Sequence, residues 1–455
     1  MRRHVIAGHY GDEDNFAYTL QPNEVLTKVD FQHHAKLGLG IGAALDDLLN
    51  QGVFPSEIAV DLLVLATHVQ IADTRLSRDS ESQDSWTREI KIIVPVADPE
   101  KWQAATPTLK RALDFLTGDI WELHFRTKLK TATDLIPKGT LPLGGVAFDE
   151  VALFSGGLDS LIGAIDSLDA GRTPLLVSHA GDGATSKAQD NCLQELRREY
   201  PKNSFNRLRL WMDLNKVNVK GSKHETTTRG RSFLFFATGI LAGSGLGKEF
   251  TLRVPENGLI ALNVPLDPLR LGSHSTRTTH PFYISRWNEF LKILGINGTV
   301  QNPYWNKTKG EMALECANKS LLEKVIPLSS SCSSPTKGRW QKLPAQHCGH
   351  CLPCLIRRAA VRKGLGEGGD KTTYTIEDLS KRTLDSNEAE GRQVRSFQFA
   401  INRLVSKPRL AKLMLHSNGS LSDQSAEDQE ELFGVYSRGL IEVSEILKNV
   451  RTSSE

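Results

Sequence analysis

The sequence lacks a long hydrophobic run. Its longest apolar stretch, Phe233 to Ala242, contains a glycine and is too short to cross a lipid bilayer. The first residues, Met1-Arg2-Arg3-His4, are not followed by the apolar core of a secretion signal. We therefore expect a protein that does not enter a membrane and a cytoplasmic location.

An excess of charge of one sign is also lacking. The chain has 56 Lys and Arg residues against 53 Asp and Glu residues, so its net charge is only +3 over 455 residues. Proteins that wrap nucleic acid carry a larger positive charge, and a nucleic-acid partner is therefore not expected. The length exceeds what one hydrophobic core supports, which predicts two or three domains.

Cysteine is scarce, and most of it is clustered. Cys192 and Cys316 occur singly in helix-like segments, where we interpret them as small buried hydrophobic residues. The other four have the spacing C-x15-C-x2-C-x2-C, at Cys332, Cys348, Cys351 and Cys354. In a reducing compartment this spacing predicts a metal site rather than disulfides. Four sulfur ligands match the tetrahedral geometry of structural Zn²⁺.

Two alternatives remain open for this cluster. His347 or His350 can replace a cysteine as a ligand, because mixed Cys/His zinc sites are common. An iron–sulfur cluster is also held by thiolates. We expect Arg357 and Arg358, on the following helix, to offset the negative charge of the thiolates.

The pattern of apolar residues divides the chain into three regions. Residues 1–145 are predicted to form an accessory α/β or α+β module, with helices at 57–73 and 107–118 and strands at 88–96 and 120–128. A Pro/Gly-rich linker at 137–145 ends this module. Residues 366–455 are predicted to form a helical C-terminal extension that closes with an amphipathic helix at 426–449.

Residues 146–365 alternate between short strands and helices. The predicted strands lie at 151–154, 173–180, 206–215 and 258–265, and the helices between and after them at 161–171, 187–200, 231–245 and 281–294. Continuous apolar strands that alternate with helices indicate a parallel sheet covered on both faces. The sequence therefore predicts an α/β fold for this region.

A glycine-rich loop follows the first of these strands. It reads Ser155-Gly156-Gly157-Leu158-Asp159-Ser160 and leads directly into a helix. Glycines at a helix N-terminus let backbone N–H groups approach an anion, and the helix dipole favours negative charge there. The serine hydroxyls can donate to phosphate oxygens, whereas the Asp159 carboxylate repels phosphate unless a cation such as Mg²⁺ lies between them. The loop thus predicts a site for a metal-bridged phosphate group.

This loop resembles the SGGxDS pyrophosphate loop of the PP-loop ATP pyrophosphatase superfamily, whose sheet is of the adenine nucleotide alpha hydrolase-like type. Together with the cysteines, the loop resembles the 7-cyano-7-deazaguanine synthase (QueC-like) family, in which a C…CGxCxxC motif follows at a similar distance. The resemblance covers about residues 148–365. It implies ATP, Mg²⁺ and Zn²⁺ as ligands, with Ser155 to Ser160 as the pyrophosphate-binding residues and Asp159 as a catalytic residue.

Two weaker segments extend the resemblance. Gly230-Arg231-Ser232 is similar to the family's GRN segment, and Thr308-Lys309-Gly310-Glu311 to its TKxE segment. The resemblance implies catalytic roles for Arg231 and Lys309. Both cations are placed at predicted helix starts, where the dipole disfavours them unless an anion binds. Thr308 and Glu311 are also explained by a helix capping box alone.

The family resemblance implies an enzyme that adenylates a carboxylate, 7-carboxy-7-deazaguanine or a similar compound, and transfers the acyl group to an amine. The additional residues at both ends are similar to those of QueC-like proteins from anti-phage defence operons of the Qat type. There the acceptor can be a protein amine of the same operon, and the product an amide rather than a nitrile. The alternatives are a tRNA-modifying PP-loop enzyme and a non-catalytic nucleotide-binding subunit.

Overall fold

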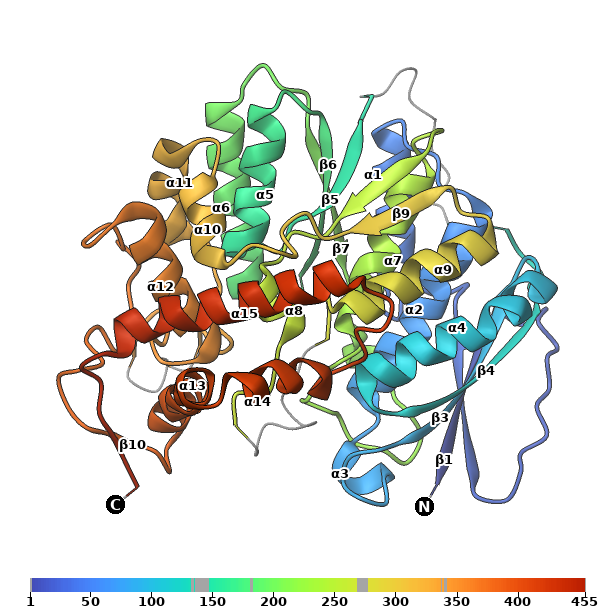
Figure 1. The fold of residues 1–455 in the computed structure, drawn as a ribbon. Helices are drawn as coiled ribbons and strands as arrows, with labels where there is room; N and C mark the ends of the chain where they lie inside the picture. Colours follow the sequence, from blue (N-terminus) through green and yellow to red (C-terminus); the bar gives the residue numbers. More distant parts are fainter. Residues whose placement is uncertain are drawn as a thin grey trace.

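The computed structural model describes residues 2–131, 135, 147–180, 183–267, 277–336, 338 and 342–454. Two sheets dominate it, and all neighbouring strands within each sheet run parallel. Helices lie on both sides of the second sheet (Figure 1). The predicted α/β fold is therefore confirmed.

The second sheet has five strands in the order β7-β6-β5-β8-β9. These strands are β5 (Glu150–Leu153), β6 (Pro174–Ala180), β7 (Asn206–Trp211), β8 (Phe250–Arg253) and β9 (Gly298–Gln301). Within this sheet, the first strand in sequence is the central β5; β6 and β7 are then added toward one edge, and β8 and β9 are added on the other side of β5. Because the direction of strand addition reverses between β5 and β8, a crevice opens at their carboxyl ends, where α/β proteins bind their ligands.

Side chains of β5 alternate between two cores, as expected for a strand buried on both faces. Val151 and Leu153 belong to the larger core, which includes residues of α7 (Arg231–Ser244) and α9 (Pro281–Leu294). Ala152 and Phe154 belong to the core on the opposite face. That core includes residues of α5 (Leu158–Asp169), α6 (Gly183–Glu199), α10 (Lys309–Glu315) and α11 (Lys319–Val325).

The N-terminal region is a second α/β unit. Its strands, in the order β2-β1-β3-β4, are β1 (Arg3–His9), β2 (Glu24–Asp30), β3 (Glu89–Val96) and β4 (Ile120–Thr127). Its helices are α1 (Ile41–Asn50), α2 (Glu57–Arg75), α3 (Arg78–Glu81) and α4 (Pro99–Thr117). Residues of α2 and α4 share one continuous core with α7 and α9, so this region packs directly against one face of the second sheet.

The C-terminal region is helical, as predicted. Residues 366–455 comprise α13 (Ala389–Ser406), α14 (Pro408–Leu413) and α15 (Ala426–Leu447), with a short pair β10 (Leu384–Asp385) and β11 (Thr452–Ser453), and α12 (Leu352–Leu365) directly precedes them. The long helix α15 contacts α12, α13 and the short α8 (Gly258–Leu262) (Figure 1). Among the described residues no helix has the length and hydrophobicity of a membrane span.

The prediction of a strand at 258–265 is wrong. These residues begin with a short helix, which Asn257 caps: its side-chain oxygen accepts the N–H of Ile260. The strand lies earlier in the chain and is β8. The helix predicted to begin at 107 begins at Pro99, where Asp98 caps it. The linker predicted at 137–145 lies outside the described residues.

Candidate functional site

The glycine loop joins β5 to α5 and ends at a helix N-terminus that no side chain caps. Gly156 has a φ of 78°, and a Cβ there would lie 3.0 Å from the backbone nitrogen of Gln189. Only glycine fits this position without strain. The hydroxyls of Ser155 and Ser160 lie 3.1 Å apart. The loop therefore presents backbone N–H groups, a helix dipole and two hydroxyls, which together suit a phosphate group.

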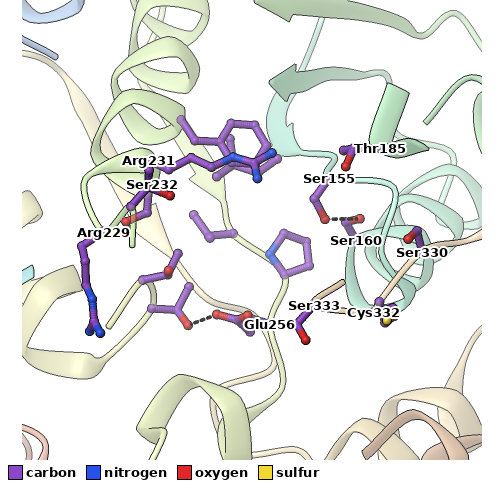
Figure 2. A pocket seen from close by; sticks show the side chains of 18 of the residues that line it. Ser155, Ser160, Thr185, Arg229, Arg231, Ser232, Glu256, Ser330, Cys332 and Ser333 are labelled. Atoms are coloured by element: carbon purple, nitrogen blue, oxygen red, sulfur yellow. Dashed lines mark hydrogen bonds between the residues drawn. The ribbon is translucent and has the colours of Figure 1, made fainter. Parts of the chain in front are cut away.

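The loop opens into a cavity of about 850 Å³. It lies at the reversal between β5 and β8, because its lining comes from the residues that follow these two strands. Residues 330–336, on the segment that leads to the cysteine cluster, complete one side. The charged side chains of the lining are Arg229, Arg231, Glu256 and Arg277. Figure 2 shows Arg231 extending toward Ser155 and Glu256 on the opposite side of the space.

Asp159 and Lys309, which lie 150 positions apart in sequence, meet beneath the loop. Asp159 Oδ2 accepts hydrogen bonds from the side chain and the backbone N–H of Asn257, at 2.7 and 3.2 Å. Its Oδ1 lies 3.2 Å from Lys309 Nζ but makes no hydrogen bond to the described residues. The two side chains are only 10 % and 8 % exposed. Among the described residues, Asp159 Oδ1 is thus engaged by the ion pair with Lys309 alone.

The capping box predicted at the start of α10 is confirmed. Thr308 Oγ1 accepts the N–H of Glu311, and the Glu311 carboxylate accepts the N–H of Thr308. Glu311 also forms an ion pair with Arg438 of α15, at 2.7 Å. These contacts determine where α10 begins, and they place Lys309 in its first turn next to Asp159.

Arg231 extends from the start of α7 toward Ser155 (Figure 2). Its Nε donates to Nδ1 of His179, at 3.3 Å. Burial, together with the positive charge of Arg231, lowers the pKa of His179 to about 3. His179 is therefore a neutral acceptor that orients the guanidinium group toward the cavity.

The N-terminal unit anchors the residues before α7. The buried carboxylate of Asp73, on α2, accepts the backbone N–H groups of Arg229 and Gly230, both at 2.6 Å. The guanidinium of Arg229 stacks 4.7 Å from the centre of the Trp86 ring. Burial and the charges of Arg78 and Arg277 lower the pKa of Arg229 to about 10. Sequence analysis did not find this support, because its residues lie about 150 positions before α7.

Glu256 follows β8 and faces the cavity. Its Oε2 accepts a hydrogen bond from the hydroxyl of Thr279. Burial raises the pKa of Glu256 to about 7; the Thr279 hydrogen bond and the charge of Lys309 oppose this shift, and the charge of Asp159 adds to it. The sequence alone makes Glu256 a candidate to bind the edge of a base or Mg²⁺, next to the strand predicted at 258–265, and leaves its role open; the structure places the strand before Glu256 instead.

The four predicted cysteine ligands converge. The Sγ atoms of Cys332, Cys348, Cys351 and Cys354 all lie within 4.8 Å of one another. Two of the pairs, Cys332–Cys351 and Cys348–Cys354, are 3.9 Å apart. A tetrahedral zinc site with Zn–S bonds of about 2.3 Å has sulfur–sulfur distances of about 3.8 Å. The cluster therefore fits a metal such as zinc.

The two arginines after the cluster donate hydrogen bonds to its surroundings. Arg357 donates to the hydroxyls of Ser329 and Ser331 and to the carbonyl of Ile326. Arg358 donates to the carbonyls of Gly349, Ile376 and Glu377. These hydrogen bonds hold the backbone and the hydroxyls around the cluster, and the offset of the thiolate charge by the two guanidinium groups stays a prediction.

The cysteine cluster is tied to the glycine loop. Nε2 of His347 accepts the N–H of Ser331, at 3.1 Å, so this histidine braces the segment that lines the cavity. The N–H of Ser330 donates to the carbonyl of Gly156, at 2.8 Å. A metal held by the cysteines would therefore stabilise one wall of the cavity.

Comparison of the sequence with protein-family models and with curated proteins finds no match. The functional argument therefore depends on the residues of the site.

Proposed function

We propose that this protein is an ATP-dependent carbon–nitrogen ligase of the PP-loop type, similar to the QueC-like synthases. The observation that carries the proposal is the glycine loop, which opens into the cavity at the carboxyl ends of β5 and β8 and faces Arg231 there. A helix N-terminus, hydroxyl donors and a guanidinium group together match the charge and the acceptor oxygens of a triphosphate.

Each residue of the site has a role in the proposal. The N-terminus of α5 and the hydroxyls of Ser155 and Ser160 bind the β- and γ-phosphates of ATP. Arg231 neutralises charge that develops at the α-phosphate during attack. Oδ1 of Asp159, which forms an ion pair with Lys309 and accepts no hydrogen bond from the described residues, would bind the Mg²⁺ that enters with ATP.

The reaction follows from the chemistry of carboxylates. A carboxylate resists attack by an amine because its oxygen is a poor leaving group. Attack of the carboxylate on the α-phosphate releases pyrophosphate and forms an acyl-adenylate, from which AMP departs readily. The protein then contributes mainly positioning and electrostatic stabilisation, for which the cavity has the necessary groups.

The substrate of the proposal is 7-carboxy-7-deazaguanine or a related carboxylate. The motifs of the loop and of the cysteine cluster support this choice through their resemblance to the QueC-like family. Zn²⁺ has a structural role in the proposal, since four sulfur ligands leave no open coordination position. The acceptor is ammonia or an amine of a partner protein in an anti-phage operon, and the product is a nitrile or an amide.

The experiment is incubation of the full chain with ATP, Mg²⁺, 7-carboxy-7-deazaguanine and ammonium, with chromatographic detection of AMP and pyrophosphate. We expect carboxylate-dependent AMP, and a fall of about 10²–10³-fold in its rate for Arg231→Met. Arg197→Met, at an exposed position of α6, is the matched control and retains the rate of the unmodified chain.

Other outcomes contradict the proposal. AMP formation that requires tRNA instead of the free carboxylate would indicate the tRNA-modifying alternative. Binding of ATP without release of AMP or pyrophosphate, with ammonium or with candidate partner proteins, would indicate a non-catalytic subunit. Intact mass of the partner proteins after the incubation distinguishes a protein acceptor from ammonia.

A further inference from the structure

Among the described residues that line the cavity, one side chain is able to take up a proton near neutral pH. The others include three arginines, which stay protonated, and the hydroxyls of serine and threonine, which are too weakly basic. Cys332 also lines it, but this residue belongs to the metal cluster. No histidine is among the described lining residues. Glu256 is the remaining candidate, and the reaction proposed above requires a proton acceptor.

The position of Glu256 is held from several sides. Its backbone N–H donates to Asn302 Oδ1, at 3.3 Å, and its carbonyl accepts from Asn302 Nδ2, at 2.7 Å. The next residue, Asn257, holds Asp159 of the glycine loop. The hydroxyl of Thr279 orients the carboxylate itself. The Glu256 carboxylate therefore has a fixed place across the cavity from the loop (Figure 2).

We propose that Glu256 is the base that accepts the proton of the attacking amine during acyl transfer. This inference rests on the proposed ligase function. The lone pair of the amine nitrogen attacks the acyl carbon of the adenylate, and a C–N bond forms. The bond from this carbon to the phosphate oxygen breaks, and AMP leaves with the electron pair. The nitrogen loses one proton to the Glu256 carboxylate, which yields the neutral amide.

The electrostatic surroundings suit this role. Burial raises the pKa of Glu256 to about 7, so the carboxyl group can both accept and release a proton near neutral pH. The charged groups that act on it are Asp159 on α5 and Lys309 on α10, which oppose each other, and Thr279 stabilises the ionised form. A base with this pKa is active above it and loses activity as the pH falls.

The test separates the two half-reactions in the full chain. Exchange of labelled pyrophosphate into ATP, in the presence of 7-carboxy-7-deazaguanine, measures adenylation alone. Rapid-quench transfer to ammonium measures the second step. For Glu256→Gln we expect exchange within about two-fold of the unmodified chain and transfer lower by about 10²–10⁴-fold. Glu249→Gln, at an exposed position before β8, is the matched control and changes neither rate.

A second variant keeps the carboxylate and moves its pKa. Thr279→Val removes the hydrogen bond that favours the ionised form, so the pKa of Glu256 rises. The transfer rate should then begin to fall at a higher pH than in the unmodified chain, and in Glu256→Gln this fall at low pH should be absent. Protonation of the amine itself affects all variants alike, so differences between their profiles belong to Glu256.

Three results would overturn the inference. The first is transfer by Glu256→Gln at the unmodified rate, and the second is an equal loss of exchange and transfer. The third is a rise in KM for 7-carboxy-7-deazaguanine with unchanged transfer, which would mean that Glu256 contacts the deazaguanine ring of the substrate and not the amine. If the unmodified chain shows no exchange and no AMP, the proposed function fails, and the inference that rests on it fails as well.

Discussion

Replacing Cys348 by alanine removes one of the four sulfurs that converge near the glycine loop. Cys348 is preferred to Cys351, because Cys351 is the N-cap of α12 and a polar replacement there could stabilise the helix independently. Among the described residues, the four cysteines pack with Tyr374 in a small hydrophobic cluster of their own. Little apolar burial is therefore available in this part of the chain to replace the metal.

The expected effect follows from the number of ligands. A structural zinc contributes about 10–16 kcal/mol in zinc-finger peptides, so one ligand in four corresponds to about 3 kcal/mol. For a large domain, with about 2 °C per kcal/mol, this predicts a fall in Tm of about 6 °C. Because Ser330 binds Gly156 and His347 binds Ser331, the affinity for ATP should fall too.

Mass spectrometry measures the loss of zinc, and calorimetry measures the fall in Tm. Cys316→Ala is the matched control, since Cys316 is also a buried cysteine but lies outside the cluster. It should retain the zinc. A Cys348→Ala chain that holds one zinc ion and unfolds at the temperature of the unmodified protein would refute the metal site.

Three further predictions concern the loop, its support and pH. Gly156→Ala should abolish ATP binding measured by calorimetry, because the added Cβ would meet the backbone of Gln189. The control is Gly171→Ala, which should retain binding: position 171 also has a positive φ, but no atom of the described residues, its chain neighbours apart, lies within 4 Å of an added Cβ. Asp73→Asn should lower the free energy of unfolding in urea by about 1.5–3 kcal/mol, because a neutral amide replaces one of the two carboxylates that pair with buried Arg88, the other being Asp119. Asp79→Asn, at an exposed position, should change it little. The free energy of unfolding should fall as the pH drops from about 6.5 toward 4. Histidines of the unfolded chain take up protons in this range, whereas the buried histidines with lowered pKa, which are His68, His179 and His280, stay neutral in the folded protein. A free energy of unfolding that does not change over this pH range would contradict the prediction.

Much of the site could be predicted where the signal is local. The glycine loop and the cysteines are recognisable because ligand spacing and a strand–loop–helix order appear within a few residues. The capping box at Thr308 and the helix at 281–294 were equally local, and both are confirmed.

The remaining parts depend on contacts between distant segments. Asp159 and Lys309 were both candidates, but their ion pair and the role of Asn257 appear only when β5, β8 and α10 come together. The apolar run at 258–265 favoured a strand, whereas a side-chain cap at Asn257 produces α8. The support of Arg229 by Asp73 has no local signature at all.

The central claim is the adenylation of a carboxylate, and transfer of oxygen tests it most directly. The full chain would be incubated with ATP, Mg²⁺, ammonium and 7-carboxy-7-deazaguanine labelled with ¹⁸O in its carboxylate, and the AMP analysed by mass spectrometry. The account predicts AMP that carries one ¹⁸O atom, because the carboxylate oxygen attacks the α-phosphate and leaves with it. Unlabelled AMP, or release of ADP instead, would contradict it.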